Sequence, residues 1–144
     1  MEIDMLNIVY GSKEYFDSLD LRNEVFRKPW GLDIKDDDLE IDRQMDMYGA
    51  FIGDQLIGTV FLLHKDKDTA QIKTLAIYEK FRGIGLGHYL MKFIEEVAKE
   101  KGYKKAYLTG REYAENFYKG LGYRPMGKPF LYKTIAHIEM EKDL

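Results

Sequence analysis

Residues 71–101, QIKTLAIYEKFRGIGLGHYLMKFIEEVAKEK, decide how the rest of the chain is organised. The pattern predicts a strand over residues 71–77, a turn over residues 78–81, a glycine-rich loop over residues 82–87 and then an amphipathic helix. Alternate glycines in the loop remove the Cβ atoms that would keep a ligand away from the backbone amides. Because amides at a helix start meet the positive end of the helix dipole, this loop favours a phosphate or pyrophosphate.

Two common nucleotide-binding motifs fit this loop poorly. A P-loop requires Gly-Lys-Ser/Thr at the helix entrance, where this chain has His88-Tyr89. A dinucleotide fingerprint requires G-x-G-x-x-G near the first strand of a βαβ unit, and that pattern is not met. The alternatives at this point are a phosphate site of another kind and a glycine-rich turn that only caps a helix.

The composition predicts one domain spanning residues 1–144, because 144 residues with 45% hydrophobic side chains suffice for one core. A net charge of -3 argues against general nucleic-acid binding, which usually shows as a basic surface. The absence of cysteine excludes disulfides, thiolate metal sites and a cysteine nucleophile. No apolar run approaches the roughly 20 residues that cross a bilayer, so we expect a cytoplasmic protein without a membrane partner.

The region before the organising stretch predicts a strand over residues 7–10 and a helix over residues 13–26, with Ser12 as its N-cap. Regular structure should end at residues 28–31, KPWG. Residues 33–46, DIKDDDLEIDRQMD, are strongly acidic. They predict either a solvated loop or short exposed helix, or a mobile wall of an acceptor site that favours a cationic amine.

A hairpin follows, with strands over residues 47–52 and 56–64, and residues 65–68 make the next turn. On the helix after the glycine-rich loop, one apolar stripe should pack on the sheet, while Lys92, Glu95, Glu96 and Lys99 face water. Gly102 ends this helix. A strand over residues 104–109 then lies parallel to the strand before the helix, and a last strand covers residues 132–140.

The loop resembles the pyrophosphate loop of the GNAT superfamily of N-acetyltransferases, whose signature Arg/Gln-x-x-Gly-x-Gly/Ala is matched by Arg82, Gly85 and Gly87. Residues 114–123, AENFYKGLGY, are similar to a later motif of that family, Ala-x-x-Phe-Tyr followed by Gly-Tyr/Phe. The two motifs stand in the family's order, separated by one helix and one strand. The resemblance is strong over residues 72–123, weaker to residue 140 and only architectural before residue 47.

The resemblance implies an α/β fold with a mixed, mostly antiparallel sheet, helices on both faces and a splayed central parallel pair that admits acetyl-CoA. It implies transfer of an acetyl group to a small-molecule or peptide amine, by direct attack in a ternary complex and without a metal. Rival readings are a longer acyl donor, a protein N-terminus or lysine as acceptor, and a catalytically inactive module that senses acyl-CoA. The oligomeric state is left open, with a homodimer as the candidate.

The resemblance also assigns site residues. A backbone amide near Ala76 or Ile77 would stabilise the oxyanion, and Tyr118 would protonate the departing thiolate. The base is less defined, because residues 72–77 lack the glutamate that some relatives have; His137 is the candidate, since histidine titrates near pH 6.5. His64, His88, Asp46 and Glu79 are weaker candidates. The predicted cofactor-binding residues are Leu75, Ala76, Ile77, Arg82, Gly83, Ile84, Gly85, Leu86, Gly87, His88, Asn116, Phe117 and Tyr118.

Overall fold

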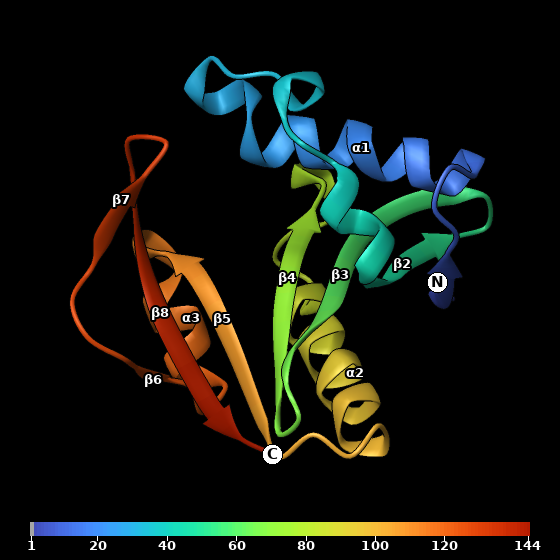
Figure 1. Cartoon of the computed structure of the whole chain (residues 1–144). Helices are drawn as coiled ribbons and strands as arrows, with labels where there is room; N and C mark the ends of the chain where they lie inside the picture. Colours follow the sequence, from blue (N-terminus) through green and yellow to red (C-terminus); the bar gives the residue numbers. More distant parts are fainter. Residues whose placement is uncertain (1) are drawn as a thin grey trace.

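Strands of one mixed sheet form the framework of the computed structural model, which describes residues 2–144 (Figure 1). The sheet order is β1-β2-β3-β4-β5-β8-β6, and β7 pairs with β8 outside this path. Every neighbouring pair is antiparallel except β4 and β5, which are parallel. The strands are β1 (Asp4–Ile8), β2 (Asp46–Ile52), β3 (Gln55–Asp66), β4 (Thr69–Ile77), β5 (Lys105–Arg111), β6 (Arg124–Pro125), β7 (Phe130–Tyr132) and β8 (Ile135–Asp143).

Helices cover both faces of this sheet. Helix α1 (Lys13–Phe26) packs on one face, where Leu21 joins Ala76 of β4 in a buried cluster. Helices α2 (Leu86–Glu100) and α3 (Glu115–Gly120) pack on the other face, around the larger core cluster. The short 3-10 helices are η1 (Lys28–Trp30), η2 (Ile34–Asp36), η3 (Glu40–Gln44), η4 (Glu79–Phe81) and η5 (Glu112–Ala114). The predicted fold class is therefore confirmed.

The parallel pair β4 and β5 separates along its length, as the resemblance to the GNAT superfamily implied. The two strands pair only from Thr69 to Gln71, although β4 continues to Ile77 and β5 to Arg111 (Figure 1). A bulge reinforces the divergence, because Thr74 has φ 58° and the β3–β4 register shifts beside it. The hydroxyl of Thr59 donates to the Thr74 carbonyl at 2.9 Å, which holds this irregular backbone in place.

Several predicted strand boundaries were wrong. The first strand ends at Ile8, because residues after it turn back: the Ser12 amide donates to the Val9 carbonyl and Gly11 has φ 81°. Strand β3 runs on to Asp66, so the turn after it is shorter than predicted. The last strand is interrupted at Lys133 and Thr134, whose positive φ values form a tight reversal between β7 and β8. Neither residue is a usual signal for such a turn, which normally contains Gly, Asn or Asp.

One predicted surface residue of α2 is internal. Glu95 is buried, accepts a 2.8 Å hydrogen bond from the Tyr123 hydroxyl and pairs with Lys142 at 2.8 Å. Burial and this carboxylate raise the pKa of Tyr123. The other three residues of that predicted face are exposed, and Gly102 follows the end of the helix with φ 92°. Among residues 2–144, no helix combines the length and apolar character needed to cross a membrane.

Candidate active site

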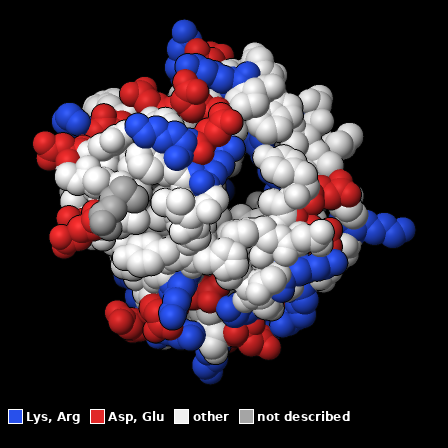
Figure 2. All heavy atoms as spheres, turned by 180° about the vertical axis from the view of Figure 1, so that it is seen from behind, with Lys and Arg blue, Asp and Glu red and all other residues white. Residues whose placement is uncertain are grey.

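A cavity of about 1370 Å³ occupies the space where β4 and β5 diverge. Its walls come from both strands, the glycine-rich loop, η5, α3 and α1. The same region appears as the hollow near the centre of Figure 2, with basic side chains at its edge. Ligands of α/β proteins commonly bind at the carboxyl ends of parallel strands, and this cavity lies at that end of the only parallel pair found in residues 2–144.

Gly83 and Gly85 leave the glycine-rich loop open, whereas a Cβ at Gly87 would lie 3.1 Å from the Phe117 ring. Gly83 and Gly85 adopt φ values of 80° and 84°, and a Cβ built on either would meet no atom within 4 Å. Gly85 is the N-cap of α2 and supplies no side chain to the first-turn amides. Arg82 fixes the loop to the end of β4, because its Nε donates to the Ile77 carbonyl at 3.1 Å. An open helix N-terminus beside a guanidinium suits an anion.

Tyr118 reaches the cavity from α3 across the backbone of β5. A Cβ at Gly110 would lie only 2.9 Å from the Tyr118 ring, so glycine there permits this close approach. No hydrogen bond to its hydroxyl is found among residues 2–144. Burial, with a smaller contribution from Tyr113, raises the pKa of Tyr118 to about 12. The phenol therefore keeps its proton throughout the physiological range and is available as a donor.

His137 lies on β8 directly opposite Arg111 of β5 and also lines the cavity. Its Nδ1 is 2.8 Å from the Ile135 carbonyl oxygen. Since a carbonyl only accepts, Nδ1 carries the hydrogen and Nε2 of the neutral ring is free to accept one. The rings of Phe130 and Tyr132 hold the imidazole, with centroids 5.9 Å and 5.7 Å away.

Most of the predicted site residues share this cavity. Ala76 instead packs beneath α1, while Ile84 and Asn116 are exposed and do not line the cavity. Two weaker base candidates do not line the cavity: His64 contacts the Tyr103 hydroxyl at 2.7 Å, and Asp46 pairs with Lys101. The predicted residues that line the cavity are Leu75, Ile77, Glu79, Arg82, Gly83, Gly85, Leu86, Gly87, His88, Phe117, Tyr118 and His137.

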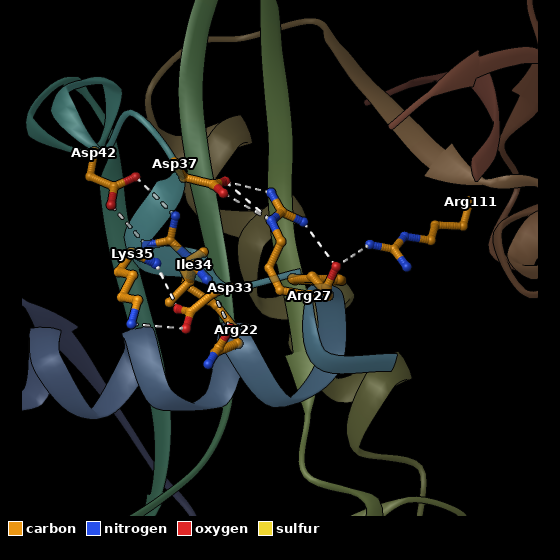
Figure 3. A network of polar contacts seen from close by, with 10 residues as sticks. Arg22, Arg27, Asp33, Ile34, Lys35, Asp37, Asp42 and Arg111 are labelled. Atoms are coloured by element: carbon orange, nitrogen blue, oxygen red, sulfur yellow. Dashed lines mark hydrogen bonds and ion pairs between the residues drawn. The ribbon is translucent and has the colours of Figure 1, made fainter. Parts of the chain in front are cut away.

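In the acidic stretch, Asp36, Asp38 and Glu40 are exposed in and beside short 3-10 helices, as the prediction of a solvated loop or short exposed helix has it. Two other carboxylates, those of Asp37 and Asp42, are instead bound by arginines (Figure 3). Asp42 is fully buried, receives bonds of 2.8 Å and 3.2 Å from Arg22 and accepts a 2.7 Å bond from the Tyr15 hydroxyl. Asp37 pairs with Arg27 at 2.6 Å, which holds the pKa of that carboxyl below its usual range. These aspartates join the 3-10 segments to α1, so they are not free to attract a cationic acceptor.

Sequence reasoning missed three residues on the α1 side of the cavity: Trp30, Lys73 and Arg111. Arg111 spans from β5 to α1, where its Nη2 donates to the Phe26 carbonyl at 3.0 Å and its guanidinium lies 4.1 Å from the centroid of the Trp30 ring. Burial lowers the pKa of Arg111, and burial followed by the charge of Arg22 lowers the pKa of Lys73. The sequence signal that could have identified Arg111 is its position, because it is the last residue of β5, a strand predicted to be parallel to its neighbour.

Comparison with known proteins identifies the class. The family described as "Acetyltransferase (GNAT) domain" matches residues 23–144, and the chain belongs to this family. Within residues 2–144, no group of three or more His, Asp or Glu side chains has an arrangement that could hold a metal ion.

Individual relatives agree with this membership. The uncharacterized protein YyaT of Bacillus subtilis is 34% identical in a match that covers 53% of this chain and 51% of YyaT. The uncharacterized N-acetyltransferase YjcF of the same organism is 26% identical in a match that covers 94% of this chain and 97% of YjcF. The match thus spans about half the length of the first two curated relatives.

Solved structures show the same fold. A crystal structure described as a putative N-acetyltransferase from Lactobacillus plantarum aligns with a TM-score of 0.85 at 23% identity, covering 99% of this chain and 98% of that one. A GNAT family acetyltransferase from Elizabethkingia anophelis, crystallised with acetyl-CoA bound, aligns with a TM-score of 0.75 at 21% identity, covering 99% and 98%.

Proposed function

We propose that this protein transfers an acetyl group from acetyl-CoA to an amine by direct attack within a ternary complex. The observation that carries the proposal is the convergence of three features on one cavity: the open glycine loop, the separated parallel strands and the Tyr118 phenol. Membership of the GNAT family supports the proposal, as does the structural similarity to the Elizabethkingia anophelis acetyltransferase crystallised with acetyl-CoA bound.

The donor fits the cavity in two parts. The pyrophosphate suits the N-terminus of α2, where Gly83 and Gly85 leave space and Arg82 supplies positive charge. The pantetheine arm suits the gap between β4 and β5, because β4 beyond Gln71 has no strand partner on its β5 side. Extended amide-containing groups commonly bind such a strand edge through backbone hydrogen bonds.

In the proposed reaction, the neutral amine attacks the thioester carbonyl, the C–N bond forms, and the C–S bond breaks to release CoA. The amine nitrogen loses one proton and the sulfur gains one. We assign the first transfer to Nε2 of His137, directly or through water, and the second to the hydroxyl of Tyr118. A backbone amide at the bulged end of β4 would stabilise the oxyanion, which is typically worth about 3 kcal/mol of barrier.

The test is turnover with a panel of amines, polyamines, aminoglycosides and peptides. Free CoA is measured with a thiol reagent, and the acetylated acceptor is identified by mass spectrometry. We expect CoA release that depends on an amine. Tight acetyl-CoA binding without amine-dependent CoA release would favour an acyl-CoA sensor, and faster turnover with propionyl- or butyryl-CoA would reassign the donor.

A further inference from the structure

The α1 side of the cavity carries more positive than negative charge close to the diverging strands. The carboxylate of Asp42 pairs with Arg22 of α1, and that of Asp37 pairs with Arg27, the C-cap of this helix. Lys73 of β4 and Arg111 of β5 line the same cavity, and neither forms an ion pair within residues 2–144. Asp38, which follows Asp37 in the acidic stretch, is exposed and lines only a smaller adjoining cavity.

One donor of the Arg111 guanidinium is buried and unsatisfied. Its Nη1 is a buried side-chain nitrogen without a hydrogen-bond partner among residues 2–144. The carbonyl that its Nη2 bonds, that of Phe26, also accepts from Nη1 of Arg27, so two guanidinium groups share one acceptor (Figure 3). An unsatisfied buried donor costs stability, and the cost is larger for a charged group. Such a group is readily explained by a ligand that supplies the missing acceptor.

The opposite sign prevails farther along α1. Asp17, Asp20 and Glu24 occupy one helix face and line the outer part of the cavity near Tyr78. Lys13 neutralises Asp17 and Lys28 neutralises Glu24, each one helical turn away. Exposed pairs of this kind exert a weak field, because solvent and salt screen them. Asp20, Asp54 and Glu79 also line the cavity without an ion pair within residues 2–144, but all three are exposed, so solvent screens them as well. Lys73 and Arg111 are only partly exposed beside the diverging strands, and their charges therefore act more strongly on a bound acceptor.

We propose that the amine acceptor carries an anionic group, a carboxylate or a phosphate, which binds Arg111 while Lys73 adds positive charge to the same wall. This inference rests on the proposed acetyl transfer and names the acceptor class for it. The guanidinium presents a planar set of donors suited to either anion, and its stacking on Trp30 restricts its orientation. Arg111 thereby determines specificity, and the acetyl chemistry belongs to other residues.

The decisive experiment compares amines that differ only in the group at the far end. The series is 6-aminohexanoate, 6-aminohexanamide and 1,6-diaminohexane, in which the long spacer keeps the amine pKa values close. We expect kcat/KM for the carboxylate to exceed that for the carboxamide by at least about tenfold, the usual effect of a charge-assisted hydrogen bond. A comparison of O-phosphorylethanolamine with ethanolamine tests recognition of a phosphate group in the same way.

Variants separate recognition from structural support. Arg111→Gln should bring the carboxylate-to-carboxamide ratio close to one, and Lys73→Gln should reduce it severalfold without touching the bond to Phe26. Arg124→Gln, an exposed arginine of β6 outside the cavity, is the matched control and should leave the ratio unchanged. A purely structural Arg111 would lower both rates equally and preserve the ratio, which would overturn the assignment.

A binding measurement tests the anionic acceptor site even if no amine in the series is acetylated. Calorimetry on the complex with CoA measures the affinity for 6-aminohexanoate and for its carboxamide directly. Tighter carboxylate binding that Arg111→Gln abolishes would support the anionic acceptor site. Equal affinities, or preference for the diamine, would overturn it, whereas absence of CoA release from every amine counts against the acetyltransferase proposal alone.

Discussion

Replacing Tyr118 with phenylalanine tests the role of the single phenol that reaches the cavity from α3. The substitution keeps the ring that packs against Gly110 and Tyr123 but removes the hydroxyl. Because no hydrogen bond to this hydroxyl is found among residues 2–144, the free energy of unfolding should change by less than about 1 kcal/mol. Acetyl-CoA affinity should also survive. The loss should therefore fall on kcat.

The size of that loss follows from the pKa of Tyr118. A phenol raised to about 12 is a weaker acid than an ordinary tyrosine, and it lies roughly 3.5 pKa units above an ordinary thiol, a difference of about 5 kcal/mol. Complete proton transfer to a free thiolate is thus uphill, so donation must accompany C–S cleavage. We expect kcat to fall by about 10², the low end of the range for general acid catalysis.

The assay uses acetyl thioesters whose leaving thiols differ in pKa. Acid assistance matters less as the leaving thiolate becomes more stable, so the defect of Tyr118→Phe should shrink for thiols of low pKa. Tyr89→Phe, on α2 outside the cavity, makes the same chemical change and should leave every rate near wild type. A defect that is equal across the donors, with chemistry shown to limit the rate, would refute Tyr118 as the acid.

Three further predictions concern charges elsewhere in the structure. Arg82→Glu should weaken CoA binding by tenfold or more in calorimetry while Arg82→Gln, which keeps the family signature, weakens it less; equal affinities would remove the pyrophosphate from this loop. Asp42→Ala should destabilise the fold by about 3–5 kcal/mol in urea unfolding, because it leaves Arg22 buried without its partner. Asp37→Asn should lower stability at pH 7. Since the Asp37 pKa is depressed in the folded state, that difference should vanish as the pH falls from about 4 through the folded pKa, and a difference that persists at pH 2 would contradict the pairing.

The sequence predicted the elements whose signals are local. Helix α1, its Ser12 cap and the parallel arrangement of β4 and β5 follow from hydrophobic periodicity, capping chemistry and the strand-helix-strand order. A Cβ at Gly83 or Gly85 would meet no atom within 4 Å, in line with the expectation that glycines leave this loop open. These features depend on neighbours within a few residues, which is why a single sequence contains enough information for them.

Contacts between distant segments were beyond local reasoning. The acidic stretch looks solvated by composition, yet Asp42 is buried because Tyr15 and Arg22, more than 15 residues earlier, supply its partners. Arg111 enters the cavity only because β5 diverges from β4 and faces α1 there. The surroundings of Arg111 are consequently a property of the folded chain, which the composition of residues 33–46 does not reveal.

The central claim is acetyl transfer within a ternary complex, and initial-rate kinetics combined with intact-protein mass measurement test it most directly. Acetyl-CoA and an acceptor from the carboxylate series are varied together, and the protein is weighed after incubation with acetyl-CoA alone. We expect intersecting reciprocal plots, no acetylated protein intermediate, and one free CoA for each N-acetylated amine. Parallel plots accompanied by an acetylated protein that passes its acetyl group to the amine would contradict direct transfer.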